Sequence, residues 1–446
     1  MQAFRSKQSR RVRIHLTGVA AVVAMACGSG ARAEVQYGLE AGAGYTDNIQ
    51  RTADNEVDET IILAGVDLTW LQERPRLNAD VRVDLNYNEY VDDAADSELT
   101  GHANGAIVFG VVPDRFTWLL EDSFGQAQQD PIAAATPANR ENINYFTTGP
   151  NLIFRLGSAA ALRLLGRYSL STYEDSPLDS ERTSGGFVLS RDLSARSLLA
   201  LNGTVEEVDF DNPANTDFDR KVASLSYTIN ASRTDITAEV GYSWIERDVA
   251  ADAETGGALV RLEIVRRVSA ASTVNLTAGT QLTDASEALR GELGGIDTGI
   301  GGGGGGGAAV TATDDTFENR FASAGWQFVR QRTSMGLDVA WEDDSYDTQP
   351  QLDSERLIYV ANVGRQLGRA GNVQLSATFT NEDFPVTNDE TEELRLGAAL
   401  SWRLGRNVGL TLTGERLDRE STDEAGDSIE NRVFLTLFYR PLPATP

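Results

Sequence analysis

Few residues of this chain could act as nucleophiles or transition-metal ligands. The sequence of 446 residues contains one cysteine, Cys27, and two histidines, His15 and His102. A metal site built on Cys and His ligands needs several such residues, and a cysteine nucleophile needs a nearby base. Neither can be assembled after residue 33, where His102 stands alone. A serine-based triad would have to use His102 as its base.

Adjacent carboxylates and a glycine tract give only weak chemical signals. Asp92 with Asp93 and Asp343 with Asp344 are typical of solvated loops, although a glycosidase built on carboxylates alone stays open. The Gly299–Gly307 tract fits a GxGxxG spacing only because almost every residue in it is glycine, and no Lys-Ser/Thr follows. No serine elbow accompanies His102. We therefore predict a protein that is not an enzyme, with no cofactor and no metal.

The first 33 residues have the pattern of a removable secretory signal peptide. Basic residues precede a short apolar run from Leu16 to Ala26, and Ala31-Arg32-Ala33 forms a small-x-small site before Glu34. This run is too short to span a bilayer, which takes about 20 residues. We predict a Sec signal cleaved near Ala33/Glu34; acylation of Cys27 is the alternative.

The charge of the chain excludes one class of partner. The formal net charge is −27, from 39 basic and 66 acidic residues. Residues 1–33 hold six of the basic residues and none of the acidic ones, so the exported chain carries −33. A nucleic-acid binder needs a basic face to replace phosphate counterions. We therefore expect no nucleic-acid partner.

Strict alternation of apolar and polar residues recurs to the end of the chain. From Leu77 to Tyr87 the odd positions are apolar or aromatic, apart from the small Ala79, and the even positions are Asn, Asp or Arg. The same pattern returns at 236–244, 372–379, 394–403 and 432–439. A period of two places each set on its own face of a β-strand.

The connections between these strands alternate between short and long. Nine short turns and ten long polar loops make 20 strands, with both termini on the short-turn side. Pro150 is the one proline inside an expected strand, which either begins after it or is bulged there, and 18 strands is the alternative count. The short turns are expected near 74–76, 112–114, 158–160, 194–196, 231–233, 269–272, 331–333, 369–371 and 405–406.

The length of the apolar stretches favours a membrane barrel over a soluble sandwich. Strands of soluble sheets run about 5–6 residues, whereas tilted membrane-spanning strands need about 9–11. Residues 34–446 therefore predict one all-β domain, a transmembrane antiparallel up-and-down β-barrel of about 20 strands in a Gram-negative outer membrane. Aromatic residues near strand ends are expected to form interfacial girdles: Trp70, Tyr87, Tyr90, Trp118, Tyr242, Trp244, Trp326, Trp341, Trp402 and Tyr439.

The polar face of these strands is expected to line the lumen. Its charges either tune the selectivity of a water-filled pore or brace the wall as cross-strand Arg–carboxylate pairs, and the sequence leaves both open. His102 belongs to this face. The candidate lumen-lining residues are Asp80, Arg82, Asp84, His102, Arg163, Arg167, Glu239, Asp338, Arg395, Arg403 and Arg432.

The long loops are acidic. Groups such as Asp92, Asp93 and Asp96 are expected to raise the local cation concentration at the mouth, and to share divalent cations with the phosphates of lipopolysaccharide. The longest loop, 285–315, contains the glycine tract and either folds into the lumen or stays outside.

The segment Gly42-Ala43-Gly44-Tyr45-Thr46-Asp47-Asn48-Ile49-Gln50-Arg51 resembles the opening of the β-barrel porin proteins of proteobacteria. Among these it is similar to outer-membrane proteins associated with PEP-CTERM/exosortase and exopolysaccharide loci. The resemblance implies an outer-membrane barrel for transport or polysaccharide export, and it supplies no catalytic residues. Expected partners are outer-membrane lipid, lipopolysaccharide, the barrel-assembly machinery and polysaccharide-export components. The alternatives are a nutrient porin, an outer-membrane rim enzyme and a surface-adhesion or structural barrel.

Overall fold

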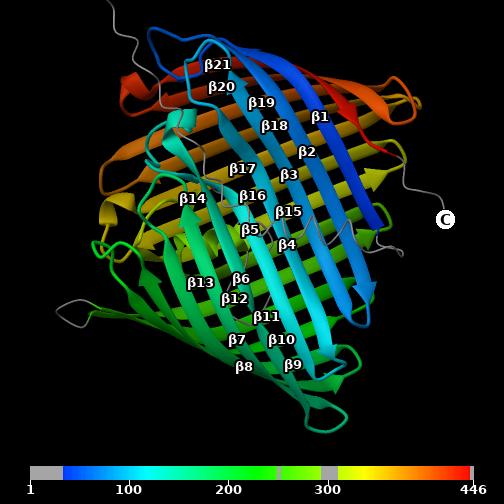
Figure 1. The fold of residues 1–446 in the computed structure, drawn as a ribbon, viewed down its shortest axis with the longest axis vertical. Helices are drawn as coiled ribbons and strands as arrows, with labels where there is room; N and C mark the ends of the chain where they lie inside the picture. Colours follow the sequence, from blue (N-terminus) through cyan, green and yellow to red (C-terminus); the bar gives the residue numbers. More distant parts are fainter. Residues whose placement is uncertain (1–33, 249–252, 293–309, 442–446) are drawn as a thin grey trace, which may run out of the picture.

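The chain folds into one closed antiparallel β-barrel (Figure 1). A computed structural model describes residues 34–248, 253–292 and 310–441. The predicted signal peptide 1–33 and the Gly299–Gly307 tract lie outside the described residues. Each wall strand pairs with its neighbours along the chain, and β1 (Glu34–Thr46) closes the barrel by pairing with β21 (Ser428–Tyr439).

Apart from the strands, the described residues form only a few short helices. Within the described ranges, three single-turn 3₁₀ helices and one α-helix, α2 (Ala285–Glu292), lie in the long loops, the 3₁₀ helices being Pro137–Asn139, Pro350–Leu352 and Glu424–Gly426. The remaining strands are β2 (Glu59–Arg74), β3 (Leu77–Tyr90), β4 (Glu98–Val112), β5 (Phe116–Gln128), β6 (Arg140–Arg155), β7 (Ala160–Tyr173), β8 (Ser180–Ser194), β9 (Ser197–Phe210), β10 (Phe218–Asn230), β11 (Thr234–Arg247), β12 (Ala253–Ser269), β13 (Ser272–Asp284), β14 (Val310–Thr311), β15 (Thr316–Arg330), β16 (Thr333–Tyr346), β17 (Ser354–Leu367), β18 (Gly371–Phe384), β19 (Asp389–Arg403) and β20 (Val408–Ser421).

The prediction of 20 wall strands is confirmed. The two-residue β14 is not part of the wall, because β13 pairs directly with β15 and β14 pairs in parallel with β5. The nine predicted short turns all separate consecutive wall strands. The alternative count of 18 is not needed.

Pro150 lies inside β6, so the prediction that the strand begins after it is wrong. Pro150 is opposite Trp118 of β5. The ladder to β7 runs from Thr148 opposite Tyr168 to Asn151 opposite Leu165, so it passes Gly149 and Pro150 without a change of register. The strand thus tolerates the missing N–H by leaving two residues unpaired on one side, with no bulge.

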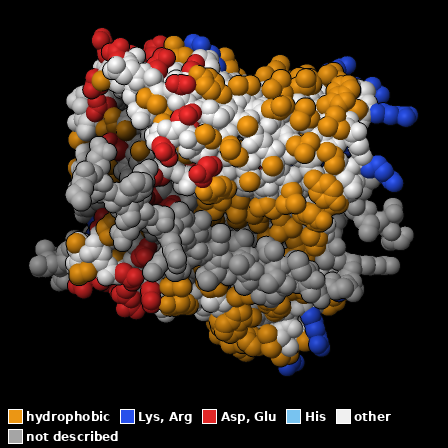
Figure 2. All heavy atoms as spheres, turned by 45° about the horizontal axis from the view of Figure 1, so that its top comes forward, with side chains coloured by type: hydrophobic (Ala, Val, Ile, Leu, Met, Phe, Trp, Pro, Cys, Tyr) orange, Lys and Arg blue, Asp and Glu red, His pale blue; other side chains and the backbone are white. Residues whose placement is uncertain are grey.

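The two faces of the wall differ as the alternation predicts. Along β11, Val240, Tyr242 and Trp244 are exposed, whereas Ser243 between them is buried. Figure 2 shows the hydrophobic side chains as a broad band on the outside, between an end rich in Asp and Glu and an end rich in Lys and Arg. Closure of the barrel pairs the backbone N–H and C=O groups of the strands, and the apolar outer belt suits the hydrocarbon core of the bilayer. The chain is therefore a transmembrane β-barrel of the bacterial outer membrane.

One predicted girdle residue is on the other face. Tyr90 has the opposite parity to Tyr87, is 5% exposed, and packs with Ile49 and Ile61. Its hydroxyl donates to Glu98. The aromatic-girdle prediction is therefore wrong for Tyr90, whereas Trp118 and Trp402 are exposed on the outer face. No helix in the described part of the chain is long and apolar enough to cross a membrane.

Candidate functional site

The long connection between β13 and β15 enters the barrel at its start. Asp284, the last residue of β13, caps α2: its Oδ1 accepts from the backbone N–H groups of Ser286 at 3.1 Å and Glu287 at 3.3 Å. An Asp at this position satisfies N–H groups that the first helical turn leaves free. The helix therefore starts at the rim where β13 ends.

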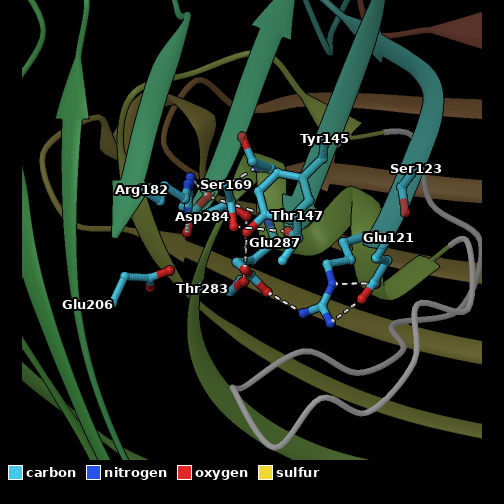
Figure 3. A network of polar contacts seen from close by, with 12 residues as sticks. Glu121, Ser123, Tyr145, Thr147, Ser169, Arg182, Glu206, Thr283, Asp284 and Glu287 are labelled. Atoms are coloured by element: carbon cyan, nitrogen blue, oxygen red, sulfur yellow. Dashed lines mark hydrogen bonds and ion pairs between the residues drawn. The ribbon is translucent and has the colours of Figure 1, made fainter. Parts of the chain in front are cut away.

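Helix α2 reaches wall strands far from β13. Arg290 donates from Nε to Glu121 Oε1 of β5 at 2.7 Å, and Tyr145 of β6 donates to Glu287 Oε1 at 2.8 Å. In the closed barrel seven wall strands separate β5 from β13, so one short helix can touch both only by crossing the interior. Figure 3 shows the side chains of Glu121, Tyr145 and Glu287 pointing into one region of the interior. The face that carries Glu121 and Tyr145 is consequently the inner face of the wall.

A buried ion-pair network joins the start of α2 to the next strands. Arg182 of β8 donates to both Asp284 carboxylate oxygens, at 2.9 and 2.5 Å. Arg220 of β10 donates to Glu206 of β9 at 2.5 Å and lies 3.6 Å from Asp284. These side chains are at most 6% exposed. Four carboxylates, those of Glu121, Glu206, Asp284 and Glu287, thus meet three guanidinium groups.

The network holds its arginines charged. Burial alone would lower the pKa of Arg290, but the carboxylates of Glu287 and Glu121 outweigh burial and raise it above the ordinary value. Desolvating such charges costs several kcal/mol per ion, by order of magnitude, unless each finds its partner. The arrangement therefore depends on every member being present.

An apolar contact supports the other side of the helix. Ala285 and Leu289, one helical turn apart, are buried against Ala127 of β5, Ile143 of β6 and Tyr173 of β7. Val310 of β14 belongs to the same cluster. Helix α2 is therefore held on the inner wall by packing as well as by charge.

The return arm of the connection is fixed by a second buried charge. Asp315 Oδ2 accepts from the backbone N–H groups of Thr348 at 2.7 Å and Gln349 at 2.8 Å. Its Oδ1 pairs with Arg247 of β11 at 2.7 Å, and Arg247 also pairs with Asp347 at 2.8 Å. Both described arms of the 285–315 loop are thus anchored. Of the two predictions for this loop, folding into the barrel is the one its described residues follow.

Other buried pairs complete the long-loop end of the barrel. Arg51, in the loop after β1, pairs with Glu430 of β21 at 3.0 Å and Glu393 of β19 at 3.1 Å. Burial lowers the pKa of Arg51 even though these carboxylates oppose the effect. Arg356 of β17 lies between Glu342 and Glu382 at 3.5 and 2.5 Å. The bracing that the sequence left open therefore occurs, mainly through residues outside the predicted set.

The eleven predicted lumen residues share the inner face with Glu121. The register shows this directly for several of them: Glu121 is opposite Ala106, which is opposite Asp80, and Asp84 is opposite His102. The same argument places Asp338 and Arg395 on one face through Val360 and Thr378. Neighbouring residues opposite one another across a ladder point to the same side. Whether a solute meets these side chains stays a prediction.

These residues do not form one cluster. Arg82 pairs with Asp80 at 3.2 Å, Arg432 pairs with Glu430 at 2.5 Å, and Arg395 pairs with Glu393 at 3.3 Å. Arg167 is 5% exposed and donates to the carbonyl oxygens of Pro150 and Gly166. Glu239 accepts from Ser224 at 2.5 Å. The predicted set is spread around the wall, and these hydrogen bonds and ion pairs are made to residues outside α2.

The residues that hold α2 escaped prediction from the sequence because their partners are far apart in the chain. Arg290 and Glu121 are separated by 169 residues, and Arg182 and Asp284 by 102. A local signal for the helix is nevertheless present. Asp284 is followed by Glu287 three residues later, the spacing of a helix start, and Glu287 is three residues from Arg290.

The described residues give little support for catalysis at His102. It is the fifth residue of β4 from the long-loop end and lies opposite Asp84. Within residues 34–248, 253–292 and 310–441, no hydrogen bond or ion pair of the His102 side chain is found, and no group of three or more His, Cys, Asp or Glu residues could hold a metal ion.

Comparison with known proteins gives only distant structural likeness. No family model and no curated protein matches this sequence. The structure is similar to the siderophore receptor PirA from Pseudomonas aeruginosa, at 10% identity over 93% of this chain and 81% of that chain with a TM-score of 0.47. It is also similar to a mutant of the ferric enterobactin receptor PfeA from Pseudomonas aeruginosa, at 10% identity over 93% of this chain and 81% of that chain with a TM-score of 0.48. The FrpB iron transporter from Neisseria meningitidis is similar at 9% identity over 91% of this chain and 82% of that chain, with a TM-score of 0.46. Likeness at this level transfers no ligand or partner to this chain.

Proposed function

We propose that this barrel is a non-enzymatic outer-membrane pore through which solutes pass passively. The observation that carries the proposal is a closed wall of 20 strands whose inner face bears charged and polar side chains. Barrels of 16–18 strands already leave an aqueous channel, and a wider one leaves room for a helix inside. The eleven inner-face residues from Asp80 to Arg432 then line the solute path.

Helix α2 narrows this path in the proposed pore. It sits on the inner wall near the long-loop end, and its anchors are the buried pairs of Arg290 with Glu121 and of Arg182 with Asp284. A fixed constriction of this kind selects solutes by size and by charge. Four carboxylates and three arginines lie on or around α2, so the charge there is mixed. It repels a charged solute of either sign less strongly than a ring of charges of that same sign would.

Export of a polysaccharide is the more specific form of the proposal. Its support is the resemblance of the segment from Gly42 to Arg51 to barrels of exopolysaccharide loci, together with the width of the barrel. The acidic long loops disfavour an anionic polymer, so the expected cargo is neutral or weakly charged. This function requires three kinds of partner: lipopolysaccharide around the barrel, the barrel-assembly machinery and polysaccharide-export components.

A deletion strain separates the candidate functions. Loss of exopolysaccharide with polymer retained in the cell supports export, whereas slowed growth on a small solute supports a nutrient porin. A strain with unchanged export and uptake contradicts both. A rim enzyme would instead show lipid or peptide hydrolysis that His102→Ala abolishes, and an adhesion barrel would show lost surface attachment alone.

A further inference from the structure

The short-turn end of the barrel carries a ring of exposed arginines. Each of the nine short turns has at least one within or beside it, and the seam between β21 and β1 adds one more. All sixteen are exposed: Arg74, Arg76, Arg115, Arg155, Arg191, Arg196, Arg233, Arg266, Arg267, Arg330, Arg332, Arg365, Arg369, Arg403, Arg406 and Arg440. Figure 2 shows most of the Lys and Arg side chains of its visible face at one end, opposite the end rich in Asp and Glu.

This ring has few counter-charges. Among the described residues, the carboxylates in the short turns or within four residues of them on the wall strands are Glu73, Asp80, Asp114, Asp192 and Asp235. Arg155 lies 3.5 Å from Asp114, and Arg440 lies 3.4 Å from Asp67, with both arginines largely exposed. A chain with a formal net charge of −27 thus concentrates positive charge in one narrow zone. Such a zone fits an anionic partner from outside the chain.

The placement of the arginines indicates what kind of partner fits. Arg191 follows the exposed Phe187 and Leu189 on the outer face of β8, and Arg365 follows Tyr359 and Val363 on β17 in the same way. The row of outward-facing side chains on β2, β12 and β15 also ends in an arginine, namely Arg74, Arg266 and Arg330. These guanidinium groups therefore lie at the edge of the apolar belt, where the lipid headgroups begin.

The aromatic residues mark the same level. Trp118 and Trp402 are 39% and 48% exposed on the outer face, each within a few residues of a short turn. Exposed indole groups are typical of the membrane interface. Long cationic side chains beside them can extend to the headgroups while their stems stay in the apolar layer.

We propose that the outward-facing arginines of this ring bind the phosphate groups of anionic phospholipids in the periplasmic leaflet. A ring that includes every short turn matches a membrane plane encircling the barrel, whereas a docked protein domain would need a patch on one side. The basic residues at the short-turn end are all arginine, since Lys221, the one lysine after residue 33, lies inside β10. This residue type suits a phosphate ligand. The guanidinium fork binds phosphate oxygens in pairs.

The test compares arginines that differ in the face they occupy. The full chain is reconstituted in nanodiscs with equal amounts of phosphatidylglycerol and phosphatidylcholine, and native mass spectrometry counts the lipids that stay bound. Two triple Arg→Gln variants remove the same charge from the same rim. The outward triple changes Arg191, Arg266 and Arg330, and the inward triple changes Arg155, Arg267 and Arg440.

The wild-type chain is expected to retain phosphatidylglycerol preferentially. The outward triple should lower this preference by roughly fivefold at each of the three altered sites, the factor that corresponds to about 1 kcal/mol for one basic residue at a lipid surface. The inward triple should keep it. An equal loss in both triples, or no preference in the wild type, overturns the proposal.

Folding is checked in each variant by heat-modifiable gel migration. If a triple fails to fold, the single variants Arg266→Gln and Arg267→Gln give a second matched pair, because these neighbours in β12 point to opposite faces. The first is expected to lower the preference and the second to leave it unchanged. Equal values for the two would also overturn the proposal.

Discussion

The two ends of the barrel handle charge in opposite ways. At the long-loop end, Arg182, Arg220 and Arg290 are nearly fully buried and each pairs with a carboxylate of the same chain. At the short-turn end, arginines such as Arg191 and Arg330 are exposed, with no ion pair among the described residues. The first set is part of the fold, and the second is available to a partner.

This difference follows from the connections. Long loops can fold back over the lumen and bury their charges against the wall, and α2 does so by bringing Glu287 and Arg290 to β5 and β6. Short turns have no chain to spare, so their side chains stay at the rim. The same residue type is therefore expected to respond very differently to substitution at the two ends.

The largest effect is expected from removing the helix itself. Replacing 285–292 with a Gly-Ser linker of equal length removes the constriction, and single-channel conductance in planar bilayers should rise by roughly twofold or more if the lumen widens accordingly. Replacing Gln331 and Arg332 of a short turn with Gly and Ser, which keeps the length of the turn, is the control and should leave conductance near the wild-type value. Equal conductance in all three would show that α2 does not limit the pore.

A smaller but still large effect is expected for Arg220→Met. The substitution leaves the buried Glu206 without its 2.5 Å partner, and breaking a buried pair in this way costs about 3–5 kcal/mol. Urea titration of the barrel in lipid vesicles measures the free energy of unfolding. A loss below about 1 kcal/mol, the range of surface ion pairs, would contradict the buried network.

The acidic loops should give a moderate effect on selectivity. Neutralising the exposed Asp92, Asp93 and Asp96 to Asn is expected to lower the cation-to-anion permeability ratio by roughly twofold at low salt. Reversal potentials in a salt gradient measure this ratio. At about 1 M salt, where the Debye length falls to ~3 Å, the difference should vanish. Anion preference in the wild type would mean that the inner arginines dominate instead.

The smallest effect is expected at the short-turn end. Arg191→Met removes an exposed side chain with no ion pair among the described residues, so the free energy of unfolding should change by no more than about 0.5 kcal/mol. It is measured beside Arg220→Met in the same vesicles. A loss of 2 kcal/mol or so, comparable with a buried pair, would remove the contrast between the two ends.

The wall could be predicted from the sequence because its information is local. Alternation such as that from Leu77 to Tyr87 and the spacing of turns define both the strand count and the outer face. The girdle prediction includes Tyr90 because this residue lies near a strand end, although its parity relative to Tyr87 already indicates the inner face. The arginines of the short turns are equally visible once the turns are located.

The lumen could not be predicted to the same extent because its contacts are distant in the chain. Parity places Asp80 or Arg395 on the inner face, but it gives no partner. The position of α2 depends on Arg290 meeting Glu121, which no pattern over neighbouring residues encodes. Only the helix start at Asp284 and Glu287 had a local signal.

The most direct test of the central claim is a charge exchange between α2 and the wall. Arg290→Glu and Glu121→Arg each place like charges at a contact of 2.7 Å, and each should release the helix and raise single-channel conductance. The double variant restores opposite charges and is predicted to return conductance to near the wild-type value. Single variants that conduct like the wild type, or a double variant as open as the singles, would contradict a lumen narrowed by a helix held through this pair.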